Sequence, residues 1–150
     1  MNRKVKIIFG LIVALFATIA VLVLFSTAFG AGAYGYGSTR GNGFQVMFGY
    51  QGKSAVPALI VAFVLELVAI FSAFVGMMMP GKISMLNYAF SAVLLLVGGI
   101  LFLNAPSLYT AINPVSYEIP VNGTGTILNA VFAFIGAALG LYGAYRIRKA

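Results

Sequence analysis

Residues 56–79 read VPALIVAFVLELVAIFSAFVGMMM, and this stretch decides the fold. Glu66 is its only charged residue. A helix needs about 20 apolar residues to cross the hydrocarbon core of a bilayer, and this segment has that length. Pro57 lies in the first turn, where a missing N–H costs least, and the Pro80-Gly81 pair that follows ends the helix and permits a tight turn. The stretch therefore predicts a transmembrane helix.

Three further segments have the same character. Each is uncharged and about as long as a bilayer requires. The chain as a whole is 62% hydrophobic and 7% charged, whereas a soluble domain carries roughly 25% charged residues. We therefore predict an all-α membrane protein, a four-helix transmembrane bundle that forms one domain over residues 1–150. Its spans are predicted at about 7–29, 56–79, 83–103 and 127–145, and its outer loops at about 30–55 and 104–126.

Basic residues gather at the ends of these spans and predict how the chain is oriented. If both termini face the cytoplasm, seven Lys and Arg residues lie inside and two, Arg40 and Lys53, lie outside. Cytoplasmic loops of membrane proteins carry the excess of Lys and Arg, so the bias selects this orientation. We predict a multi-pass protein of the plasma membrane with the N- and C-termini in the cytoplasm. The seven inner residues are Arg3, Lys4, Lys6, Lys82, Arg146, Arg148 and Lys149.

The residue types argue against an enzyme. The chain has no Cys and no His, and its only acidic residues are Glu66 and Glu118. Thiol nucleophiles, imidazole bases and paired carboxylates, which most catalytic and metal sites use, are therefore missing. The basic residues flank the spans instead of forming the single basic face that nucleic-acid binding needs. We predict a non-enzymatic protein without cofactor or metal, whose partners are the lipid bilayer and either another protein or a second copy of this chain, and not nucleic acid.

Alternation of residue types in both outer loops predicts strands. The run 44–50, FQVMFGY, places an aromatic or β-branched residue at every second position, and the run 115–121, VSYEIPV, repeats the pattern. Period two is typical of a strand with one covered face, and Asn42-Gly43 suits a hairpin turn before the first run. We predict a small extracellular antiparallel β-sheet of two or three strands, with residues 34–38 as a partner strand. The alternative is glycine-rich loops whose aromatic residues lie among the lipid headgroups.

The same loops hold the residues that we expect to contact a partner. Aromatic side chains on an exposed face are frequent anchors of protein interfaces. The extracellular contact candidates are Phe44, Gln45, Phe48, Tyr50 and Tyr117.

Glu66 lies eleven positions into its span, which places it about 15 Å deep. A charged side chain at that depth costs about 2.5 kcal/mol or more in contact with lipid. Ala62, Ala69, Ala73 and Gly76 share its helical stripe, and such small residues let a neighbouring helix approach closely. We therefore predict that Glu66 faces another helix.

The intramembrane polar site is predicted to consist of Glu66, Thr18 of the first span and Asn129 of the fourth span. In one interpretation these groups form hydrogen bonds that lock the helices together. In the other, Glu66 is a proton or cation site on a transport path, since ionisable groups inside membranes are often functional. The spans contain no second ionisable group to continue a proton relay.

The fourth span carries small residues at four-residue intervals, Gly136, Gly140 and Ala144. Such a stripe lets two helix backbones come close together. We predict that it is a helix-packing face, used within one chain or between two copies of the chain.

The layout resembles that of the claudin-like tetraspan membrane proteins over the whole chain. Like them, this chain has four spans, a longer first outer loop with a strand pattern and a shorter second loop. The segment 44–49, FQVMFG, occupies a place comparable to the first-loop tryptophan motif of that family, although the tryptophan and the pair of cysteines are absent. The resemblance implies an extracellular sheet seated on a four-helix bundle that mediates contacts between molecules. The basic ends, the lack of Cys and the small size are more similar to bacterial membrane proteins.

Two functions are compatible with these features. The first is a structural, adhesion or accessory-subunit role, in which the extracellular loops engage a partner. The second is a small transporter or channel that uses Glu66 as a proton or cation site. Small four-span multidrug exporters are similar in size and use a membrane-embedded Glu, but here the Glu lies in the second span.

Overall fold

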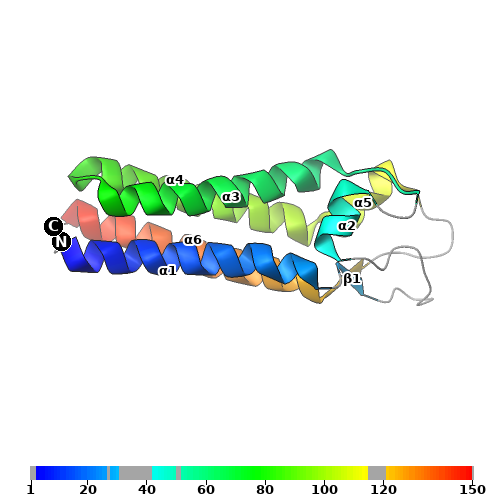
Figure 1. Cartoon of the computed structure of the whole chain (residues 1–150), viewed down its shortest axis with the longest axis horizontal. Helices are drawn as coiled ribbons and strands as arrows, with labels where there is room; N and C mark the ends of the chain where they lie inside the picture. The colour runs from blue at the N-terminus through cyan, green and yellow to red at the C-terminus, as the bar shows by residue number, and fades with distance from the viewer. Residues whose placement is uncertain (1–2, 27, 31–41, 50–51, 115–120, 150) are drawn as a thin grey trace.

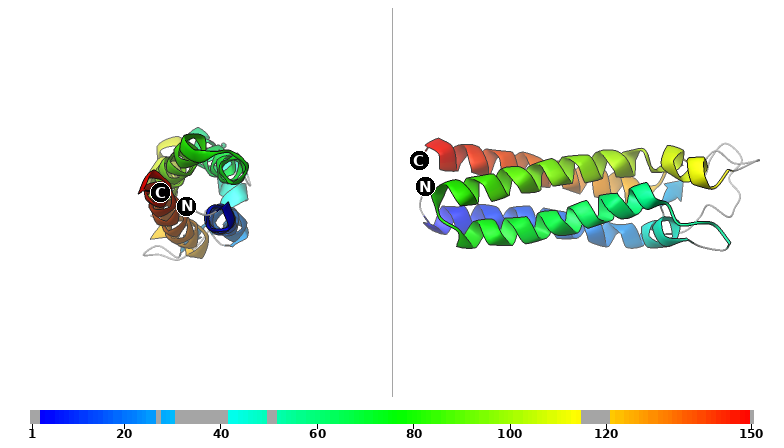
Figure 2. Two further views of the ribbon diagram at one scale, coloured as in Figure 1. Left: turned by 90° about the vertical axis from the view of Figure 1, so that its left-hand side faces the viewer. Right: turned by 90° about the horizontal axis from the view of Figure 1, so that it is seen from above.

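The computed structural model describes residues 3–26, 28–30, 42–49, 52–114 and 121–149. Four long helices lie side by side and alternate in direction, so that both chain termini reach the same end (Figure 1, Figure 2). We name this the termini end, and the opposite end the loop end. The long helices are α1 (Arg3–Leu22), extended by the 3-10 turn η1 (Val23–Phe25), α3 (Pro57–Met78), α4 (Gly81–Leu103) and α6 (Thr124–Lys149).

All four long helices are long and apolar enough to cross a membrane. Their outward faces carry large apolar side chains; Phe71 of α3, for example, is 75% exposed. Water would oppose that exposure, whereas lipid does not. The prediction of four transmembrane helices in a bundle is confirmed to this extent, and the surfaces fit a multi-pass protein surrounded by lipid.

The interior is built from small residues. In the ring of four helices, α1 packs against α3 and α6, and α4 packs against the same two helices (Figure 2). Much of the central core is alanine, which brings the helix axes close together. Buried core residues from all four helices include Ala14, Ala17, Ala69, Ala73, Ala92, Ala133 and Ala137.

The small-residue face of α6 points into this core. A Cβ added at Gly136 would lie 3.0 Å from Cδ1 of Leu95, and one added at Gly140 would lie 3.0 Å from the backbone oxygen of Tyr88, both on α4. Ala144, one turn further along, is also buried. The face therefore packs α6 against α4 within the chain.

Serine hydroxyls join α3 to α4. Ser91 donates to the carbonyl of Ala69 at 2.7 Å, and Ser84 donates to the carbonyl of Gly76 at 2.6 Å. Each bond supplies a carbonyl of the neighbouring helix with a donor in a region without water.

The loop end carries two short helices and one short strand pair. They are α2 (Gly43–Phe48), α5 (Ala105–Ile112), β1 (Phe29–Gly30) and β2 (Val121–Asn122). The strands pair antiparallel, with Phe29 opposite Asn122 and Gly30 opposite Val121. Helix α5 lies within the segment 104–126, which was predicted to be an outer loop.

The predicted extracellular sheet of two or three strands is wrong. Residues 44–48 are helical, because Asn42 begins α2 with a capping box instead of making a hairpin turn: its side chain accepts from the Gln45 N–H at 2.9 Å, and the Gln45 side chain accepts from the Asn42 N–H at 3.0 Å. In the described ranges the only strands are β1 and β2, of two residues each. Residues 34–38 and 115–120 lie outside the described residues.

Candidate functional site

Glu66 lies on the buried stripe of α3, inside the bundle. Its side chain is 0% exposed. Ala62, Ala69, Ala73 and Gly76 on the same stripe are buried as well. The stripe therefore presents one carboxyl group among small residues, with room for a partner from another helix.

The partner is Asn129 of α6. Its Nδ2 donates to Oε2 of Glu66 at 2.7 Å and to the backbone oxygen of Ala20 in α1 at 2.8 Å. Helices α3 and α6 lie across the ring from each other, since each packs mainly against α1 and α4. The Asn129 amide group of α6 therefore hydrogen-bonds to α3, which lies across the bundle, and to α1, which lies beside α6.

Helix α4 closes the remaining side of the carboxyl group through Gly98. A Cβ added at Gly98 would lie 2.8 Å from Cγ of Glu66 and 3.2 Å from its Oε1. A real Cβ does not approach so closely, so only glycine fits unless Glu66 moves. Residues of all four long helices therefore take part in the site, since the Ala20 carbonyl of α1 contacts Asn129.

Two buried oxygen atoms of the site have no hydrogen-bond partner among the described residues, Oε1 of Glu66 and Oδ1 of Asn129. An unpaired buried polar atom costs about 1–3 kcal/mol. Both atoms are acceptors when the carboxyl is ionised, so only a donor or a cation can satisfy them. A proton on Glu66 is the smallest such group, because it changes Oε1 from an acceptor into a donor.

Thr18 takes no part in this pair. Its hydroxyl donates to the carbonyl of Ala14, four residues earlier in the same helix, at 2.7 Å. The structure therefore brings together Glu66 and Asn129, and leaves Thr18 bonded within α1. Neither Gly98 nor the Ala20 carbonyl was predicted as part of this site. The Gly98-Gly99 pair in the sequence could have indicated a close helix approach at Gly98. The Ala20 carbonyl could not be predicted from a residue type, because every residue has a backbone oxygen.

The extracellular contact candidates have different surroundings. Phe44 packs between Phe25 and Phe63, with ring centroids at 4.7 Å and 5.5 Å, respectively. Phe48 lies beside Phe63 at 6.1 Å and remains 53% exposed. Gln45 is occupied by the capping box of α2. Tyr50 and Tyr117 lie outside the described residues, so Phe48 is the described candidate with the most accessible side chain.

A second amide side chain organises the loop end. Asn113, which is 6% exposed, accepts from the Ser54 N–H at 2.8 Å and donates to the Ser54 carbonyl at 2.9 Å. This pair joins the segment before α3 to the segment after α5. It holds together the two loops that the predicted sheet was expected to join.

Within the described residues, no cluster of three or more His, Cys, Asp or Glu side chains is placed to hold a metal ion. Comparison of the chain with protein-family models, curated proteins and solved structures finds no match.

Proposed function

We propose that this protein is a non-enzymatic component of the plasma membrane with a structural, adhesion or accessory-subunit role, and that both termini lie in the cytoplasm. The orientation is supported by the seven Lys and Arg residues of the termini end, against Arg40 and Lys53 on the loop side of the sequence. The role is supported by a closed interior combined with an exposed aromatic group at the loop end.

The enclosure of Glu66 is the observation that carries this proposal. A transported ion needs a route that reaches the acidic group from one side of the membrane or the other. Glu66 is fully buried, its Oε2 is bonded to Asn129, and Gly98 stands against its other side. Such packing favours a group that holds helices together over one that exchanges with the solvent.

The partner surface is proposed to include Phe48 of α2. The Phe48 ring packs against the ring of Phe63, and its side chain is more than half exposed. A rigid aromatic side chain on a supported surface gives a large contact area at a small cost in entropy. A protein partner or a second copy of the chain would cover it.

Photo-crosslinking in the native membrane tests this surface. A benzophenone amino acid replaces Phe48, and in a control replaces Phe71, which is 75% exposed on α3. Lipid surrounds Phe71 in this arrangement, so we expect a discrete higher-mass adduct from position 48 and none from position 71. Equal adducts from both positions, or none from position 48, would exclude a specific partner there.

A small transporter or channel is the second candidate, and the unpaired oxygens of Glu66 and Asn129 favour it. An unsatisfied oxygen on a buried intramembrane acid is what a proton or small cation would bind. Purified protein in liposomes distinguishes the two functions. Proton-coupled flux that is lost in Glu66→Gln would establish transport, whereas no flux under any imposed gradient would leave the structural role.

A further inference from the structure

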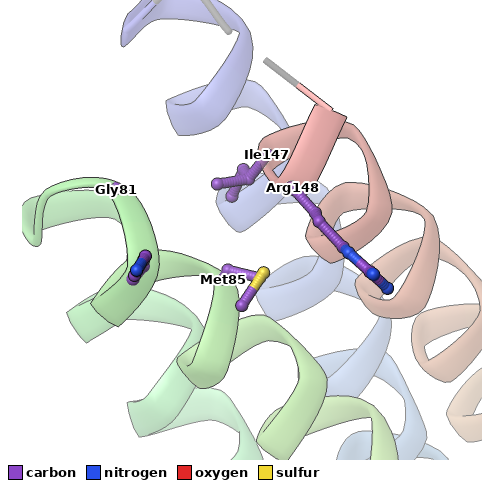
Figure 3. A pocket seen from close by; sticks show the side chains of 5 residues that line it. Gly81, Met85, Ile147 and Arg148 are labelled. Carbon is purple, nitrogen blue, oxygen red and sulfur yellow. The ribbon is translucent and has the colours of Figure 1, made fainter.

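A pocket of about 400 Å³ opens at the termini end between α4 and α6. Gly81, Lys82 and Met85 line it from the first turns of α4, and Ile147 and Arg148 line it from the last turn of α6 (Figure 3). Its volume falls within the range of small-molecule sites, about 300–1,000 Å³. The pocket lies far along the bundle from Glu66, so it belongs to neither the intramembrane site nor the loop end.

The walls of the pocket combine apolar and cationic groups. Met85 of α4 and Ile147 of α6 are half-buried, and both line the pocket (Figure 3). Lys82 and Arg148 are exposed, and the guanidinium of Arg148 extends along α6 from a stem that lines the pocket (Figure 3). A ligand here would meet apolar side chains and the exposed Lys82, and Arg148 would contact it by turning its exposed guanidinium back from α6 toward the pocket.

Helix α4 adds backbone donors to the same pocket. Pro80 precedes its first residue, and no side chain caps this helix end. The N–H groups of Gly81 and Lys82 have no acceptor within the helix, because the first turn of an α-helix leaves its donors unpaired. The positive end of the helix dipole lies at the same place, and both features favour an anion.

The other described cations of this end are largely engaged. Lys6 donates to the carbonyl of Met79, Arg146 lies over the ring of Tyr142, and Lys149 lies over the ring of Tyr145. Among the residues that the structure describes, Lys82 and Arg148 make no hydrogen bond or ion pair. Glu66, the acidic side chain that the structure describes, lies in the middle of α3 and does not pair with them.

We propose that this pocket binds the phosphate headgroup of an anionic phospholipid. Basic pockets between transmembrane helices are suited to such headgroups. A lipid is favoured over a soluble anion because Met85 and Ile147 are apolar lining residues, and because Leu86, the residue after Met85, is 62% exposed and offers a surface for an acyl chain. The inference rests on α4 and α6 crossing the membrane and does not depend on a protein partner.

Native mass spectrometry of the full chain in mild detergent tests the site. The protein is titrated with phosphatidylglycerol or with phosphatidylcholine, lipids that share their acyl chains but differ in net charge. We expect phosphatidylglycerol to be retained in preference to phosphatidylcholine. Replacing both lining cations, Lys82→Gln with Arg148→Gln, should weaken phosphatidylglycerol binding roughly thirtyfold, given the contribution of each cation near an anionic surface.

A matched control separates this pocket from the general charge of the termini end. Arg146→Gln with Lys149→Gln removes the same amount of charge from the termini end, at positions outside the pocket, and should change binding less than about threefold. An equal loss in both double variants would overturn the proposal, and so would equal retention of the two lipids. A competition experiment with glycerol phosphate distinguishes a lipid from a soluble anion. If glycerol phosphate competes as strongly as the lipid at equal concentration, the site recognises a soluble anion and the lipid assignment is wrong.

Discussion

The middle of the bundle and its loop end each depend on one buried asparagine, and the two side chains are used differently. Asn113 at the loop end pairs both its oxygen and its nitrogen with the backbone of Ser54. Asn129 in the middle donates from its nitrogen twice, to Glu66 and to Ala20, and its oxygen has no partner; Oε1 of Glu66 has none either. A saturated amide is a structural connection only. An unsaturated pair inside a membrane retains the capacity to bind a proton or a cation.

The largest effect is expected from Gly98→Ala. The added methyl group would lie 2.8 Å from Cγ of Glu66 and 3.3 Å from the backbone oxygen of Ala62, so it should destabilise the bundle by about 1–3 kcal/mol through overpacking. Gly143→Ala is the matched control, because its Cβ would meet Phe9 at an ordinary 3.5 Å; helix propensity then favours Ala by up to about 1 kcal/mol. Unfolding in mixed micelles measures both variants, and equal stabilities would show that α4 does not close the site.

Asn113→Ala should follow in size. It removes both bonds to Ser54 and leaves one backbone N–H and one carbonyl to find other partners, at a cost of about 1–3 kcal/mol. The loss should stay local, so hydrogen exchange should accelerate at residues 52–56 and remain unchanged around Glu66. Asn104→Ala is the control, since Asn104 makes an exposed bond to the Ile100 carbonyl of its own helix. Faster exchange throughout α3 would show that the two regions are coupled.

Glu66→Gln should have a small effect on stability, within about 1 kcal/mol. We expect a protonated carboxyl group, because a proton would give the unpaired Oε1 a donor role; a glutamine then replaces its O–H donor with N–H donors while still accepting from Asn129. Infrared spectroscopy should show the carbonyl band of a protonated carboxylic acid in the wild type and lose it in the variant. A large destabilisation without such a band would mean that the site holds an ionised carboxylate and its counter-ion.

Thr18→Val is expected to have the smallest effect, within about 0.5 kcal/mol. The hydroxyl bonds only to the Ala14 carbonyl of its own helix, and such bonds contribute little to helix stability. The same unfolding assay measures the change. A loss comparable to that of Gly98→Ala would place Thr18 in the polar site after all.

The four membrane-spanning helices could be predicted from sequence because the requirement is local. Each backbone amide must find its acceptor within its own segment where water is absent, so an uncharged run of sufficient length can only be a helix. The same argument indicated that Glu66 faces a neighbouring helix, since lipid contact is too costly. It named Asn129 as a partner but also Thr18, because depth along two helices does not specify their rotation.

The loop end could not be predicted in the same way. The run 44–48 has the alternation of a strand. However, Gly43, Val46 and Met47 are buried on one side of α2, and their spacing is that of a helix. In so short a run the two periods cannot be distinguished, and a capping box together with the packing of Phe44 between Phe25 and Phe63 selects the helix.

The sequence by itself determined that this chain forms apolar helices with one acidic residue turned away from lipid, because hydrophobicity and backbone hydrogen bonding act within each segment. Only the tertiary structure decided that Asn129 hydrogen-bonds to Glu66 across the ring, that Gly98 packs against the Glu66 side chain and that Lys82 and Arg148 line one pocket. Those contacts join residues far apart along the chain, and their geometry depends on how each helix is rotated about its axis, which hydrophobicity alone leaves open.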